Sequence, residues 1–153
     1  MVLSTFAVVI LRYVFSVGWV WLQESYVWMH GVVFMVGAGY TLLHNGHVRV
    51  DIFYRPASIR YKALIDILGA CALLLPMVVL VFLVGFDYVK SSWSMLEASR
   101  EAGGMPGLFL LKTVILVFCV LTATQGLSLA ARSLLVLFGH PEFVADAEEA
   151  GKV

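Results

Sequence analysis

Four stretches of the chain consist almost entirely of apolar residues, and most polar residues lie between them. The stretches run from Val2 to about Phe15, from about Tyr26 to Leu43, from about Leu64 to Phe86 and from about Leu108 to Phe138. A helix that crosses a bilayer needs about 20 predominantly apolar residues. The pattern therefore predicts an all-α integral membrane protein with four transmembrane helices. We expect a single domain over residues 1–140 and a short acidic cytoplasmic tail over residues 141–153.

The first and last stretches depart from the usual length of a span. The first is short, and it lacks the basic region and small-residue cleavage site of a signal peptide. We therefore expect a true helix whose natural start lies upstream. The last stretch is too long for a perpendicular crossing, so we expect it to tilt or to project beyond the bilayer.

The residues that follow the third stretch have a helical spacing of their own. Phe86, Val89, Trp93 and Leu96 recur at intervals of three and four, and mostly polar residues fill the opposite face. This pattern is typical of a helix that lies in the membrane interface. We expect an amphipathic interfacial helix between the third and fourth transmembrane helices, anchored by Trp93 and ended by the glycine-rich residues 103–107.

The composition supports the membrane assignment. Hydrophobic residues make up 61% of the chain and charged residues 13%, against roughly 45–50% and about 25% in soluble domains. The ten basic and ten acidic residues cancel, which gives no electrostatic case for a nucleic-acid partner. Cys71 and Cys119 lie in apolar stretches, and we interpret both as small core residues.

The basic residues predict the orientation in the membrane. Arg49, Arg55, Arg60 and Lys62 lie between the second and third stretches, whereas the next loop carries fewer basic residues and several acids. Basic residues in short loops favour the cytoplasmic side. We therefore expect the first of these loops and both termini in the cytoplasm, and the loop before the fourth helix outside.

Few ionisable residues lie near the expected spans, and most of them have a functional and a structural interpretation. Arg12 and Glu24 flank the first turn. Glu24 would be a proton-coupling carboxylate with Arg12 as its counter-charge, or the two side chains would form an ion pair or snorkel and so brace the first hairpin; we favour this structural role. His30 would be a haem ligand or a hydrogen-bonded packing residue; we favour packing, because haem ligation usually needs a second histidine at matching depth. Lys112 lies about one turn inside the fourth helix, where it can snorkel to the interface.

The fourth stretch carries a polar face that includes Thr122 and Gln125. These side chains could line a solute path, or they could hydrogen-bond to a neighbouring helix. We favour the second interpretation, because no charged residue joins them at mid-depth. We find no phosphate loop, catalytic triad or metal cluster in the sequence, and we expect neither an enzyme nor a cofactor.

A polar segment follows the second stretch. After a glycine that can end a helix, His47, Arg49 and Asp51 alternate with valines, so an extended backbone places the three polar residues on one side. We expect them to order the cytoplasmic loop, with Arg49 available to lipid phosphate or a partner.

The order of these segments resembles the small integral membrane subunit, of the DctQ type, of tripartite ATP-independent periplasmic (TRAP) transporters. The resemblance covers most of the chain and rests on 12–15 (RYVF), 21–24 (WLQE), 46–51 (GHVRVD), 97–99 (EAS), 103–106 (GGMP), Lys112 and 125–127 (QGL). The glycine-to-aspartate motif is the most specific of them. The chain departs from the family at its amino terminus, where a cytoplasmic lead-in and a full first helix are usual.

The resemblance implies a division of labour. A periplasmic solute-binding protein would deliver an organic acid to the membrane complex, and a large membrane subunit would carry the solute and sodium sites and move as an elevator. This chain would be the scaffold that packs against the large subunit in a bacterial inner membrane. Two other functions stay open: a self-sufficient four-helix antiporter that uses Glu24, and a haem-bearing membrane anchor of a redox complex.

Overall fold

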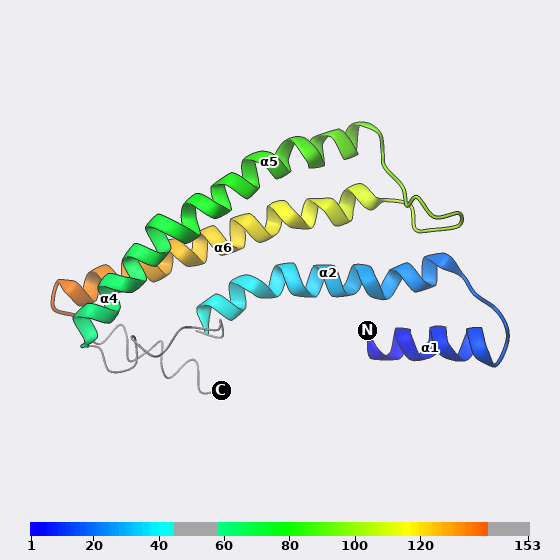
Figure 1. Ribbon diagram of the computed structural model, residues 1–153, viewed down its shortest axis with the longest axis horizontal. Coiled ribbons are helices and arrows are strands. Elements are labelled where there is room, and N and C mark those ends of the chain that lie inside the picture. The colour runs from blue at the N-terminus through cyan, green and yellow to red at the C-terminus, as the bar shows by residue number, and fades with distance from the viewer. Residues whose placement is uncertain (45–57, 141–153) are drawn as a thin grey trace. The chain divides into compact units, whose positions relative to one another are not determined.

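A computed structural model of the chain describes residues 1–44 and 58–140, and these residues form helices and no strand. The elements in chain order, labelled in Figure 1, are α1 (Val2–Tyr13), α2 (Val20–Leu43), α4 (Ile59–Leu68), the π-helical turn η1 (Gly69–Leu74), α5 (Leu75–Ser94) and α6 (Leu108–Leu137). The all-α prediction is thus confirmed for the part of the chain that the structure describes.

Among the residues that the structure describes, three helical segments are long and apolar enough to cross a membrane. They are Val20–Leu43, Ile59–Ser94 and Leu108–Leu137, which correspond to the second, third and fourth predicted spans. Helix α1 has 12 residues, which gives it a length of about 18 Å, against a hydrocarbon core of about 30 Å. The count of four transmembrane helices therefore stays a prediction.

The structure does not confirm a separate interfacial helix after the third predicted span. Residues 86–94 are the last part of α5, and the helical segment continues without a break from Ile59 to Ser94. No proline occurs between residues 86 and 94, and Gly85 alone does not end a helix. The apolar spacing was real, but it belongs to the end of a long helix.

Pro76 explains the π-helical turn inside this segment. A proline has no N–H to donate, and its ring collides with the carbonyl four residues earlier in a regular α-helix. The chain widens over Gly69–Leu74, and the Leu75 N–H reaches back to the carbonyl of Ala70. A single widened turn of this kind accommodates the proline without ending the helix.

The described residues belong to two compact units, and each combines segments that are distant in the sequence. The first unit consists of residues 1–37 and 84–117, and the described part of the second consists of residues 38–44, 58–83 and 118–140. In the second unit, small residues let helices approach closely: a Cβ atom on Gly39 would lie 3.2 Å from Leu121 Cβ, and one on Gly126 would lie 2.5 Å from Leu74 Cδ2. The apolar residues buried in this unit are Ala63, Ala70, Val78, Cys119 and Val136.

Candidate functional site: the 95–107 loop

Glu24 fixes the loop that joins α5 to α6, residues 95–107, which Figure 1 shows in yellow-green. The side chain extends from the second turn of α2. One carboxylate oxygen accepts a hydrogen bond from the Ser99 hydroxyl, and the other accepts one from the Met105 N–H at 2.6 Å. The Ser99 N–H also donates to the Met105 carbonyl at 3.2 Å. One carboxylate therefore holds both ends of a closed loop segment.

Gly104 lies against the same carboxylate. A Cβ atom at this position would lie 2.5 Å from Ser99 Oγ and 2.9 Å from Glu24 Oε2, closer than real Cβ atoms approach other atoms. Glycine is therefore the residue that this space admits. We call Glu24, Ser99, Gly104 and Met105 the Glu24 cluster.

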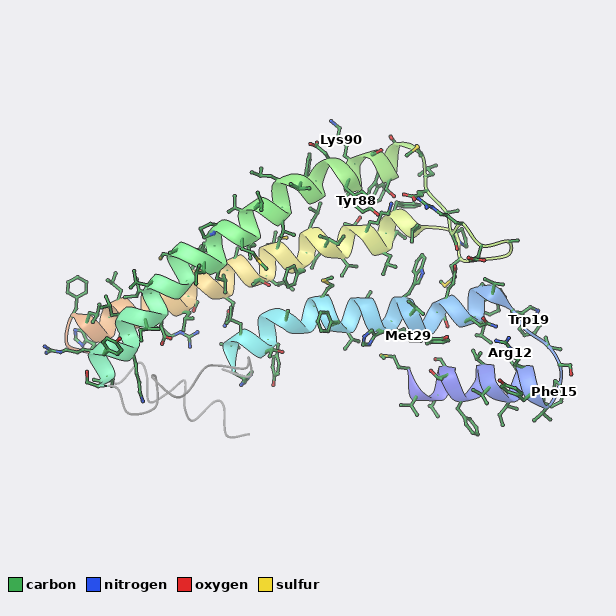
Figure 2. The ribbon with its side chains drawn as sticks, in the orientation of Figure 1. Arg12, Phe15, Trp19, Met29, Tyr88 and Lys90 are labelled. Carbon is green, nitrogen blue, oxygen red and sulfur yellow. The ribbon has the colours of Figure 1, made fainter. Side chains whose placement is uncertain are left out.

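A second carboxylate, Glu97, ties the loop to both neighbouring helices. Its Oε2 atom accepts a hydrogen bond of 2.6 Å from the Ser92 hydroxyl on α5 and forms an ion pair with the Lys112 ammonium on α6. The Lys112 nitrogen also lies 4.0 Å from the centre of the Tyr88 ring, a distance at which a cation is attracted to an aromatic face. In Figure 2, Tyr88 lies on the side of α5 that faces α6. Glu97, Ser92, Lys112 and Tyr88 form the Glu97 cluster.

The Glu97 cluster coincides with the end of α5. The Glu97 N–H donates to the Ser92 carbonyl at 3.1 Å, and the Leu96 N–H donates to the Trp93 carbonyl at 3.2 Å. These two bonds define the Schellman motif, in which the residue after the helix adopts a left-handed conformation. Leu96 does so with a φ of 45°. The apolar contact that often accompanies the motif is replaced by the hydrogen bond between Ser92 and Glu97.

The environment of Glu97 favours its charged form. The hydrogen bond from the Lys112 ammonium, followed by the one from the Ser92 hydroxyl, lowers the pKa of the Glu97 carboxyl below its ordinary value, against a smaller opposing effect of burial. A hydrogen bond to the ionised form stabilises that form over the protonated one. The cluster is therefore assembled at neutral pH.

Trp93 joins α5 to α6 beside the Glu97 cluster. Its indole Nε1–H donates to the Thr113 hydroxyl at 2.9 Å, and its ring meets the edge of the Phe109 ring at a centroid distance of 4.6 Å. The tryptophan was expected to anchor an interfacial helix, and it instead closes the end of a long helix onto its neighbour. The expectation that Lys112 snorkels stays a prediction, and the structure adds that its ammonium group pairs with Glu97.

The ion pair that the sequence predicted between Arg12 and Glu24 is not found among the contacts of the described residues. Arg12 is exposed in the last turn of α1, and the carboxylate of Glu24 is engaged by the loop. A cation near the carboxyl end of a helix is favourable without a partner, because it interacts with the helix dipole. Arg12 and Phe15 are labelled in Figure 2 on α1 and just after it.

The remaining predicted residues are not brought to this site. His47, Arg49 and Asp51 lie outside the described residues. Gln125 lies on α6 in the second unit, and its Nε2 atom is buried without a hydrogen-bond partner among the described residues, rather than bonded to a neighbouring helix. His30 is exposed, with its ring 6.2 Å from that of Phe34.

Sequence reasoning found Glu24 and Lys112 but missed their partners. Ser99 lies 75 residues from Glu24, and Glu97 lies 15 residues from Lys112. The sequence did mark these partners as family landmarks, because residues 97–99 and 103–106 were among the segments that carried the family resemblance. The structure shows that these segments meet at one site.

Comparison with known proteins identifies the family of the chain. The chain is similar to the C4-dicarboxylate TRAP transporter small permease protein DctQ of Vibrio cholerae, with 33% identity over 82 residues, which is 53% of this chain and 35% of the relative. The chain thus matches about a third of the length of that relative, and no solved structure matches it. The family model of the DctQ component of tripartite ATP-independent periplasmic transporters matches residues 1–136. The chain therefore belongs to the DctQ component family of these transporters.

Proposed function

We propose that this small permease subunit is a non-catalytic scaffold that packs against a large membrane subunit. The complex would import organic acids with sodium coupling and would receive its solute from a periplasmic binding protein. The sodium and solute sites would lie in the large subunit. The scaffold would lie in a bacterial inner membrane with both termini in the cytoplasm and the 95–107 loop outside.

The observation that carries the proposal is how the chain uses its carboxylates. Glu24 and Glu97 are both engaged by hydroxyl, N–H and ammonium groups of the same chain. A carboxylate that carries an ion or a proton across a membrane must exchange partners during each cycle. Carboxylates whose partners fix a loop to three helices instead support a rigid frame, against which another subunit can move.

The surface of the helices is suited to burial in lipid or against another membrane subunit. Large apolar side chains are exposed on each long helix, including Phe34 at 68%, Val84 at 68% and Leu127 at 57%. Exposed apolar surface on this scale needs lipid or a protein partner to cover it.

Co-purification tests the scaffold function directly. The chain would be tagged at its carboxyl terminus, expressed with its native genetic neighbours and solubilised in mild detergent. We expect a large multi-span membrane protein to be recovered with it in a fixed ratio. Recovery of the tagged chain alone, after crosslinking in intact membranes before solubilisation, would contradict the proposal.

Reconstitution tests the two alternatives. If the chain were a self-sufficient antiporter, liposomes containing it alone would show solute flux that Glu24→Gln abolishes. If it were a haem-bearing anchor, the purified chain would show a Soret band. We expect neither, and flux that depends on Glu24 would overturn the scaffold function.

A further inference from the structure

Two polar side chains inside the second unit have no partner among the described residues. Thr122 Oγ1 and Gln125 Nε2, both on α6, have almost no accessible surface and make no hydrogen bond. Thr122 as a whole is 8% exposed. Buried polar groups without a partner are rare in native proteins, because each loses its hydrogen bonds to water.

The other threonines of α6 show that Thr122 is an exception. Thr113 donates to the carbonyl of Phe109 at 2.8 Å, and Thr124 donates to the carbonyl of Val120 at 3.0 Å. This bond to the preceding turn is the usual way for a threonine to satisfy its hydroxyl inside a helix. Thr122 does not form it, so its hydroxyl is free to donate to a different acceptor.

Thr122 and Gln125 are placed so that one acceptor can serve both. Residues three apart in a helix lie on the same face, with Cβ atoms about 5–6 Å apart. The adjacent Gly126 contacts the side chain of Leu74, so the π-helical turn reaches this level of α6.

We propose that an internal water molecule bridges Thr122 and Gln125 in the second unit. Buried water molecules typically make about three hydrogen bonds to polar groups that are otherwise unsatisfied. A charged ligand does not fit the site, because no residue of α6 between Lys112 and Arg132 is charged. The water oxygen accepts one hydrogen bond from each side chain.

A double-mutant cycle on the full chain in lipid nanodiscs tests the bridge. Thr122→Val and Gln125→Leu each remove one of the two donors that hold the water, so the water is lost and the other side chain is left buried and unsatisfied. We expect each single variant to lower the Tm by about 2–4 °C, and the double variant to return close to the parent. If the site is dry, each single variant removes an unpaired buried group and raises the Tm, and the two effects add; that result would overturn the proposal.

Nuclear magnetic resonance on the parent chain distinguishes a water bridge from a direct bond between the two side chains. We expect the side-chain amide protons of Gln125 to exchange magnetisation with water, and Thr122→Val to abolish that signal while Thr122→Ser retains it. Thr124→Val, on the same helix, is the control and should leave the signal unchanged. A Gln125 amide without a water signal in the folded parent chain would refute the bridge.

Discussion

Glu24 acts on the loop through donors that carry no formal charge. Its carboxylate accepts from a hydroxyl at Ser99 and from a backbone N–H at Met105, and hydrogen bonds to a carboxylate are among the stronger ones in proteins. Gly104 completes the cluster by leaving room for the two donors. The conformation of the loop thus depends on a residue of α2 and on the absence of a side chain at one position.

Gly104→Ala should open the Glu24 cluster. The new methyl group would overlap Ser99 and the Glu24 carboxylate, and overpacking of this kind costs about 1–3 kcal/mol. We expect a lower Tm and several-fold faster tryptic cleavage after Arg100, which is exposed in the loop.

Gly37→Ala is the matched control for this substitution. Gly37 lies in α2, and a Cβ atom there would meet nothing within 4 Å, so the added methyl should leave cleavage unchanged and favour the helix slightly. Equal cleavage rates in the two variants would show that the Gly104 contact does not hold the loop.

Charge pairing explains why the partner of Glu24 could not be predicted from the sequence. Pairing opposite charges selects Arg12, which is near in sequence, whereas the observed donors are neutral groups 75 and 81 residues away. Hydroxyl and N–H donors occur at many positions, so a sequence pattern does not single them out. The loop residues were visible only as family landmarks.

At the scale of elements, α5 ends in a conformation that is costly for its sequence. Leu96 occupies the left-handed position of the Schellman motif and is 67% exposed. Glycine is the usual residue at this position, because a side chain there meets the following carbonyl. The end of the helix is held instead by the Glu97 cluster, which compensates for the strain.

Leu96→Gly should therefore stabilise the chain. Relief of the left-handed strain is worth about 1–2 kcal/mol, and the extra freedom of glycine in the unfolded chain offsets about 0.5–1 kcal/mol of it. We expect a small rise in Tm. Met95→Gly is the control, because Met95 is the neighbouring residue and has no positive φ; it should lower the Tm. A lower Tm in both variants would show that Leu96 is not strained.

Glu97 should make stability depend on pH at the acid end. Because its pKa is lowered in the folded chain, the unfolded chain binds the proton first as the pH falls. The stabilisation is therefore present above the ordinary range of a glutamate, about 4.3, and is lost as the pH falls through the lowered pKa.

The comparison of wild type with Glu97→Gln measures this effect. We expect a difference in Tm at pH 7 that shrinks as the pH falls below the ordinary range of a glutamate and through the lowered pKa of Glu97. Lys112→Met should reduce the same difference, because Lys112 makes the largest contribution to the lowered pKa. A difference that stays constant with pH would rule out this role for the Glu97 carboxylate.

Hydropathy located the helices well but not their ends. The apolar centre of α2 was predicted from about Tyr26, whereas the helix begins at Val20, because glutamine and glutamate are good helix formers without being apolar. The continuation of α5 was missed for the same reason, because the polar residues on one face of its last turns are compatible with a helix. The π-helical turn could have been predicted only by placing Pro76 inside a helix rather than at the end of one.

At the scale of the whole molecule, the described chain offers three helical segments long enough to span a membrane and one shorter apolar helix. The 95–107 loop joins two of these segments, so its side of the membrane determines the direction of both. The distribution of basic residues predicts that the loop lies outside.

Labelling of a single cysteine tests this orientation. In a chain with Cys71→Ala and Cys119→Ala, Ala102→Cys places a thiol at an exposed position of the loop. We expect a membrane-impermeant maleimide to react with it once the outer membrane is opened and the inner membrane is intact. If the thiol reacts only after the inner membrane is disrupted, the loop lies in the cytoplasm and the predicted orientation is wrong.

The distance along the chain between Glu24 and its partners has a consequence for biosynthesis. Ser99 leaves the ribosome 75 residues after Glu24, which takes roughly 4–15 s at about 5–20 residues per second. During this interval α2 already carries a carboxylate for which its permanent donors do not yet exist. The amino-terminal end of α2 must therefore stay in contact with water until α5 has been inserted. Closure of the loop is thus a late step in the maturation of the subunit.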